Sequence, residues 1–203
     1  ARRILREADI VIALGTRLRR PYTNRRGTRL KELVHVDVDD QWMGRNYPAS
    51  LKIVSPDLSA VVEAMARILG DKKTDWDVEA LKAAQGRERE ALGASPGYAV
   101  TTLLRASIPP DTVTVWDPTL IWYWAERYFP VLKEGTFISP CGTLPTFYAV
   151  PAAIGAKIAK PGQPCLCVTG DGSALPALAE LATVKKYDIP VVFLVYNNNK
   201  YGV

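Results

Sequence analysis

The sequence is poor in the residues from which most zinc sites, disulfide frameworks and catalytic triads are built. It holds a single histidine, His35, and three cysteines among 203 residues. A zinc site or a histidine-based triad therefore has almost no material in this chain. Cys141, Cys165 and Cys167 have neither zinc-site spacing nor a disulfide pattern, which is typical of a reducing compartment. Cys165 and Cys167 alternate around one residue of an expected strand, so both should point into the same core.

Long apolar runs are absent as well. No run reaches the ~18 residues that indicate a membrane-spanning helix, and residues 1–7 form the start of a charged amphipathic helix rather than a signal peptide. We therefore expect no membrane partner and a cytoplasmic location. Because the chain starts with Ala1 and stops inside a motif, we also expect it to be part of a longer polypeptide.

Positive charge is in modest excess, with a formal net charge of +5, and it is unevenly distributed. Much of it lies between Arg17 and Arg29, in one expected loop. Basic and aromatic residues do not interleave there as they do in a nucleic-acid groove, so we expect no nucleic-acid partner. A solvated loop and an anion site for a phosphate group both fit the pattern.

Short apolar segments alternate with segments of helical spacing along most of the chain. Strands are expected at residues 9–15, 32–39, 51–54, 112–116, 136–139, 164–169 and 191–196. Helices are expected at residues 2–8, 58–69, 100–106, 122–128, 150–159 and 175–186. This alternation indicates an α/β fold with parallel sheets. We divide the chain into a Rossmann-like unit (residues 1–70), a linker helix region (71–97) and a second Rossmann-like unit (98–203).

Two polar motifs follow neighbouring strands of the second unit. Gly170-Asp171-Gly172 comes directly after the strand at 164–169, and Asn197-Asn198 comes directly after the strand at 191–196. One helix between the two strands makes a βαβ crossover, which brings both motifs to the same edge of the sheet. A carboxylate, an amide oxygen and a nearby backbone carbonyl suit a small hard cation that holds a diphosphate.

This pair of motifs resembles the cofactor motif of the thiamine diphosphate-dependent 2-oxo acid enzymes, which include acetolactate synthase and benzoylformate decarboxylase. The spacing from Asp171 to Asn198 equals the family pattern without a gap, and Pro151-Ala-Ala-Ile-Gly155 is similar to a family helix. The segment at 180–183, Glu-Leu-Ala-Thr, looks like acetolactate synthase, whereas the ending at 197–202 looks more like benzoylformate decarboxylase. The resemblance covers nearly the whole chain and implies that the second unit has a thiamine diphosphate-binding fold, truncated at its C-terminus.

The resemblance assigns a magnesium ion to the carboxylate of Asp171, the side chain of Asn198 and the main-chain carbonyl of Lys200. Two diphosphate oxygens and a water would complete the octahedral shell that magnesium requires.

The resemblance also implies which residues hold the rest of the diphosphate. We expect Gly170 and Gly172 to let the backbone turn sharply and approach the ligand. The amides of Gly172 and Ser173 should point at a phosphate near a helix N-terminus. Tyr201 falls where members similar to benzoylformate decarboxylase place a tyrosine near the diphosphate.

The segment that should hold the cofactor rings departs from the family pattern Gly-x-(Met/Leu)-Gly-(Phe/Tyr)-x-x-Pro. A gapless match puts Thr146 where an apolar residue wedges the two rings, Phe147 at a glycine position, and Leu144 where a glycine carbonyl would bond the aminopyrimidine. A two-residue insertion would instead restore Gly142 and make Leu144 the wedge. The sequence leaves both registers open.

No catalytic residue is assigned within the chain, because the family's catalytic glutamate lies in an N-terminal domain that nothing here matches. The resemblance implies that the intact enzyme is a lyase or transferase that cleaves or forms a carbon–carbon bond of a 2-oxo acid. It also implies a homodimer or homotetramer with active sites between subunits, so that this excerpt alone is inactive. The alternative is a catalytically silent paralogue that binds the cofactor, or a regulatory subunit. The chain does not identify the 2-oxo acid.

Residues 1–70 resemble the later part of the family's central domain, in which some members bind FAD or ADP and others bind nothing. Gly15, Arg17, Asp37 and Asp39 are the residues that would contact a nucleotide. A purely structural Rossmann-like domain remains the other interpretation. An unrelated nucleotide-binding dehydrogenase is disfavoured, because no Gly-x-Gly-x-x-Gly follows a strand.

Overall fold

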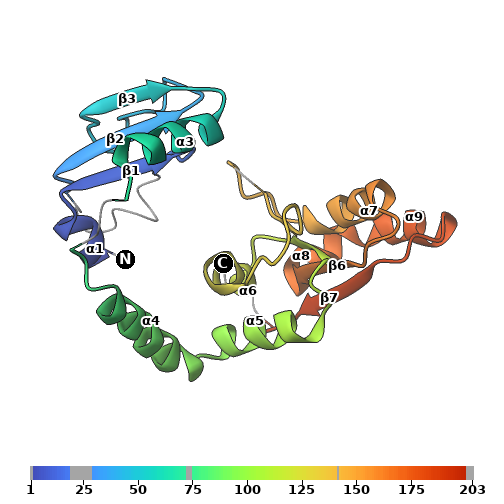
Figure 1. The fold of residues 1–203 in the computed structure, drawn as a ribbon. Helices are drawn as coiled ribbons and strands as arrows, with labels where there is room; N and C mark the ends of the chain where they lie inside the picture. The colour runs from blue at the N-terminus through green and yellow to red at the C-terminus, as the bar shows by residue number, and fades with distance from the viewer. Residues whose placement is uncertain (1, 19–28, 72–74, 141, 200–203) are drawn as a thin grey trace. The chain divides into compact units, whose positions relative to one another are not determined.

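A computed structural model describes residues 2–18, 29–71, 75–140 and 142–199. The chain divides into two compact units, Ala1–Trp76 and Asp77–Val203, each built around its own parallel sheet (Figure 1). The α/β class expected from the sequence is therefore confirmed. No helix among the described residues is long and apolar enough to cross a bilayer.

The first unit contains a three-stranded parallel sheet in the order β1-β2-β3. Its elements are α1 (Arg2–Glu7), β1 (Ile10–Leu14), β2 (Glu32–Asp37), β3 (Leu51–Val54) and α3 (Leu58–Leu69). Helix α3 begins at a cap in which Asp57 accepts a hydrogen bond from the Ala60 amide at 3.0 Å. It ends at Gly70, whose φ of 56° is readily accessible to glycine. All five elements lie where the sequence pattern predicts them.

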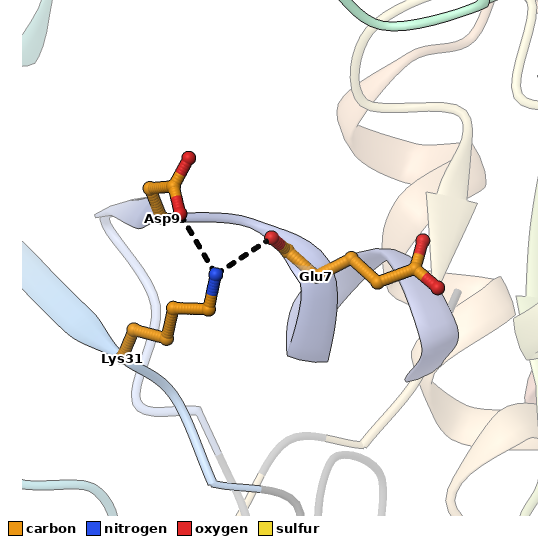
Figure 2. Close-up of polar contacts among 3 residues, drawn as sticks. All are labelled: Glu7, Asp9 and Lys31. Atoms are coloured by element: carbon orange, nitrogen blue, oxygen red, sulfur yellow. Dashed lines mark hydrogen bonds and ion pairs between the residues drawn. The ribbon is translucent and has the colours of Figure 1, made fainter.

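Lys31 fixes the end of α1 to the start of β1 (Figure 2). Its Nζ atom donates to Asp9 Oδ1 at 2.8 Å and to the Glu7 carbonyl at 3.3 Å. The hydrogen bond from Lys31 is the main reason that the pKa of the Asp9 carboxyl lies below its usual range. A cation at this end of a helix also complements the helix dipole.

The second unit contains a four-stranded parallel sheet in the order β5-β4-β6-β7. Its strands are β4 (Val113–Trp116), β5 (Phe137–Ile138), β6 (Cys165–Gly170) and β7 (Val192–Tyr196). Its helices are α4 (Val78–Gly93), α5 (Pro96–Ser107), α6 (Leu120–Tyr128), α7 (Ala149–Ala159), α8 (Asp171–Ala177), the 3-10 helix η1 (Leu178–Glu180) and α9 (Leu181–Lys186).

Strand β6 separates two apolar clusters, so it lies at the centre of the second unit. Leu166 and Val168 pack in one cluster with residues of α6, and Cys165 and Cys167 pack in the other with residues of α7. Successive strand side chains point to opposite faces, which explains why the two cysteines share a face. Both thiols are free and buried, as the sequence predicts.

The single helix expected at residues 175–186 is wrong in its start and its continuity. Helix α8 begins at Asp171, directly after the last residue of β6, and the chain then passes through η1 into α9. Pro176 lies inside α8, and proline lacks the amide hydrogen that the helical ladder needs. A break in the helix near this residue is the physical consequence.

Candidate functional site

The two polar motifs of the second unit end at neighbouring positions on one sheet edge. Strands β6 and β7 run parallel, with Gly170 paired to Tyr196. Asp171 follows Gly170 directly, and Asn198 is the second residue after Tyr196. The βαβ crossover inferred from their spacing is therefore confirmed, whereas the ligand roles of the residues remain predictions.

The expected sharp turn at the glycines of Gly170-Asp171-Gly172 is wrong. Gly170 has a φ of −97° and belongs to β6, and Gly172 lies inside α8. The strand enters the helix without a loop, so no left-handed residue is needed. Gly170 instead permits close packing, because a Cβ atom there would lie 3.0 Å from Cγ2 of Thr119.

Exposure differs along the start of α8. Asp171 is half-buried and Gly172 is exposed, whereas Ser173 is buried. The Ser173 side chain is thus part of the interior. The prediction that Ser173 contacts a phosphate concerns its backbone amide only.

The chain after β7 forms a turn that uses the first asparagine. Asn197 Oδ1 accepts a hydrogen bond from the Asn199 amide at 2.8 Å, and Asn199 has a φ of 55°. Such a side-chain-to-backbone bond is typical of asparagine in turns. Asn198 is half-buried beside it. Lys200 and Tyr201, the other predicted contacts here, lie outside the described residues.

A third strand end contributes two residues that the sequence analysis did not select. Asp117 and Thr119 follow β4, the neighbour of β6. Asp117 has no exposed surface, and Thr119 is only 7% exposed. Among the described residues the Thr119 hydroxyl has no hydrogen-bond partner. The available signal was a polar run immediately after a buried strand, the same signal that identified the other two motifs.

The segment that the sequence analysis expects to hold the cofactor rings, from Gly142 to Tyr148, leads into α7. Leu144 is exposed, and Thr146 is half-buried. Phe147 has a φ of 62°, in the left-handed region that favours glycine. Residue 147 is thus in a glycine-like conformation at the position where the gapless register expects a glycine.

Donor chemistry at the sheet edge fits an anion and a hard cation better than a soft metal. No group of three or more histidine, cysteine, aspartate or glutamate side chains that could hold a metal occurs among the described residues. Asp171 supplies one carboxylate, and Thr119, whose buried hydroxyl has no partner among the described residues, packs its methyl group against Gly170, the residue before Asp171. A diphosphate that brings its own oxygen ligands suits such a sparse set.

The candidate nucleotide contacts of the first unit are used by the unit itself. The side chains of Asp37 and Asp39 accept hydrogen bonds from the Asp39 and Gln41 amides. The Arg17 guanidinium lies 4.5 Å from the centre of the Trp42 ring. These contacts account for the three side chains through the local structure alone, in line with the structural interpretation of residues 1–70.

Comparisons with known proteins agree with this architecture. A model of the C-terminal thiamine pyrophosphate-binding domain of thiamine pyrophosphate enzymes matches residues 120–203, and a model of the central domain of these enzymes matches residues 1–65. Thiamine pyrophosphate and thiamine diphosphate are the same cofactor.

Similar curated proteins cover almost the whole chain. A probable acetolactate synthase large subunit of Methanococcus aeolicus is 27% identical over 98% of this chain and 37% of its own length. A probable 2-ketoarginine decarboxylase of Pseudomonas aeruginosa is 29% identical over 98% of this chain and 36% of its own length. The isozyme 2 large subunit of acetolactate synthase from Escherichia coli is 28% identical over 98% of this chain and 37% of its own length.

The chain thus spans little more than a third of the length of the curated relatives it matches. The central-domain model matches the first unit, and the C-terminal-domain model matches the second unit. The chain belongs to the thiamine pyrophosphate enzyme family.

Proposed function

We propose that the whole protein uses thiamine diphosphate and Mg²⁺ to cleave or form a carbon–carbon bond next to the carbonyl of a 2-oxo acid. Support comes from the names of its relatives, which are acetolactate synthases and a 2-ketoarginine decarboxylase. The observation that carries the proposal is the adjacency of the β6 and β7 ends, since it allows one ion to be shared by Asp171 and Asn198.

In this proposal the metal is held by Asp171, Asn198 and the main-chain carbonyl of Lys200. One carboxylate and two neutral oxygens leave room for diphosphate oxygens and a water in an octahedral shell. The ion therefore joins the protein to the cofactor instead of occupying an all-protein cage.

Thr119 is the residue that we add to the diphosphate contacts Gly170, Gly172 and Ser173. A buried hydroxyl without a partner is costly unless a ligand or water completes its hydrogen bonds. Thr119 lies against Gly170, one residue before the proposed metal ligand. Its hydroxyl would donate to a diphosphate oxygen there.

For the cofactor rings we favour the gapless register of the segment from Gly142 to Pro151. The left-handed φ of Phe147 supports it, because that register puts Phe147 at a family glycine. Thr146 then takes the position of the wedge, and Leu144 supplies the carbonyl for the aminopyrimidine. The predicted alternative, which restores Gly142 and makes Leu144 the wedge, is supported by the φ of 94° at Gly142, but it leaves the strained φ of Phe147 without a glycine counterpart in the family.

When bound, thiamine diphosphate supplies the carbanion-stabilising chemistry of the reaction. The residues of this chain anchor and orient it. The catalytic glutamate of the family belongs to a domain outside this chain, so we also propose a homodimer or homotetramer with active sites between subunits. This chemistry does not require FAD or ADP in the first unit.

The test is Mg²⁺-dependent binding of thiamine diphosphate to the full-length protein, measured by titration calorimetry. We expect Asp171→Ala to weaken binding by about 100-fold or more, since even residues that only support a metal ligand are worth 10–100-fold. Glu134→Ala removes an exposed carboxylate of the same unit and should leave the affinity unchanged. Equal affinities for wild type and Asp171→Ala would remove Asp171 from the ligand set.

A silent paralogue is the second candidate, and the unusual residues Thr146 and Phe147 favour it. Release of carbon dioxide from a panel of 2-oxo acids separates the two. Tight cofactor binding by the full-length protein without turnover of any panel member would support the silent paralogue over the enzyme.

A further inference from the structure

Asp117 is the one carboxylate among the described residues that has no exposed surface. It follows β4, and its backbone amide donates to the Val168 carbonyl at 3.0 Å, so that the pairing of β4 with β6 continues to this residue. Burial of a carboxylate is unfavourable unless hydrogen bonds compensate for the lost water.

Two distant segments supply those hydrogen bonds. The Ala149 amide donates to Oδ1 at 2.9 Å, and the Thr169 hydroxyl donates to Oδ2 at 2.5 Å. The Tyr148 amide also donates to the carboxylate. One side chain therefore joins the ends of β4 and β6 to the start of α7.

At α7 the Asp117 carboxylate replaces a local cap. The N-cap residue, Tyr148, has helical backbone angles and makes no side-chain capping bond. An anion at a helix N-terminus satisfies amides that the helix leaves unpaired and complements its dipole. Asp117 therefore sets where the chain enters α7, immediately after the left-handed Phe147. A residue in that conformation persists only where its surroundings hold it.

At β6 the same carboxylate is bound to Thr169, which lies two residues before Asp171. We propose that Asp117 is a positioning residue that fixes the segment from Gly142 to Tyr148 relative to the end of β6. Resting on the proposed function, this means that Asp117 aligns the ring-binding part of the cofactor site with its metal–diphosphate part. Asp117 touches neither part of the cofactor in this proposal.

Three variants separate the links. Asp117→Ala removes all the hydrogen bonds that the carboxylate accepts, from Ala149, Thr169 and Tyr148. Asp117→Asn keeps an acceptor for Ala149 and a polar partner for the Thr169 hydroxyl. Thr169→Val keeps the shape of residue 169 and removes only the hydrogen bond from its hydroxyl to the Asp117 carboxylate.

The experiment compares two ligands of the full-length protein in the presence of Mg²⁺: thiamine diphosphate and inorganic pyrophosphate. Pyrophosphate reports the metal–diphosphate part alone, so the ratio of the two affinities reports the contribution of the rings. We expect Asp117→Ala and Thr169→Val to keep pyrophosphate binding within about twofold and to lower the affinity for thiamine diphosphate roughly 10-fold. Asp117→Asn should preserve the wild-type ratio.

The outcomes are distinguishable. Wild-type protein that binds neither ligand overturns the proposed function and this inference with it. Wild-type binding combined with an unchanged ratio in Thr169→Val and Asp117→Ala overturns this inference alone, because a merely structural role lowers both affinities together. Circular dichroism identifies the folded variants, and Thr169→Val carries the test if Asp117→Ala does not fold.

Discussion

His35 is buried in the first unit with both ring nitrogens directed at backbone groups. Its Nε2 lies 2.7 Å from the Thr16 carbonyl, and the Gly44 amide donates to Nδ1 at 3.3 Å. This pattern requires the neutral ring with its hydrogen on Nε2. The imidazole thereby ties the chain after β1 to the chain between β2 and β3, which is a structural role.

Replacement of His35 by leucine should therefore be costly. The Thr16 carbonyl and the Gly44 amide would lose their partner, and an unsatisfied buried group costs about 1–3 kcal/mol. We expect the free energy of unfolding of the first unit to fall by roughly 2–4 kcal/mol. Hydrogen exchange of the β1–β3 amides measures it, with the exposed Val38→Ala as the control. A loss as small as that of the control would contradict this role.

Single residues were predictable from the sequence where their signal is local. Asp171 and Asn198 each follow an apolar strand, so their placement at one sheet edge could be inferred from spacing alone. Asp117 is different, because its partners Ala149 and Thr169 lie 32 and 52 residues away. Periodicity and short motifs contain no information about such contacts, so the role of Asp117 could not be predicted, although its position after a buried strand could have been noted.

At the scale of elements, buried strands and capped helices were the predictable features. Strand β6 is buried at every position, and it reads in the sequence as a short apolar run before a glycine. The prediction of the helix bounds failed at α8. This helix starts directly at the end of β6, and it ends near Pro176. Glycine next to a strand end indicated a turn, whereas the structure uses Gly170 for packing against Thr119.

The turn before α7 allows a test at this scale. The Cβ atom of Phe147 strains a left-handed backbone, at a cost of about 1–2 kcal/mol that glycine avoids. We expect Phe147→Gly to be more stable than Phe147→Ala by roughly 1 kcal/mol, although glycine usually destabilises. Urea unfolding of the two variants provides the measurement. Alanine serves as the control because both changes remove the half-exposed ring, and greater stability of the alanine variant would refute the strain.

At the scale of the molecule, burial of acidic groups links stability to pH. Burial raises the pKa of the Asp117 carboxyl, and the hydrogen bonds from Thr169, Ala149 and Tyr148 offset this only in part. The thiol of Cys167 is also affected: burial, then the nearby Asp117 charge and Cys165, raise its pKa to about 12. Of these two buried groups, Asp117 is therefore the one whose charge changes in acid.

The sign of the effect follows from proton binding. A carboxyl whose pKa is higher in the folded than in the unfolded state binds its proton more tightly when folded. Its contribution to stability is therefore largest at low pH and declines as pH rises from about 3.8 through the folded pKa.

We expect the unfolding free energy of wild type, minus that of Asp117→Asn, to decrease as pH rises through this window and then to level off. Urea titrations of both proteins at matched pH values measure the difference, and the asparagine variant serves as the reference because it cannot ionise at this position. A difference that grows with pH would contradict the assignment of a raised pKa to Asp117.

Gly170 and Thr119 are packed so closely that the side chains allowed at positions 119 and 170 depend on each other. A methyl group at 170 would lie 3.0 Å from the methyl carbon of Thr119, which is closer than side chains ordinarily pack. In any chain that keeps this geometry, added bulk at 170 requires residue 119 to give way, either by a shift of a few tenths of an ångström or by a smaller side chain. Sequence change at the end of β6 is thus coupled to sequence change at the start of α6, although the two positions are far apart along the chain.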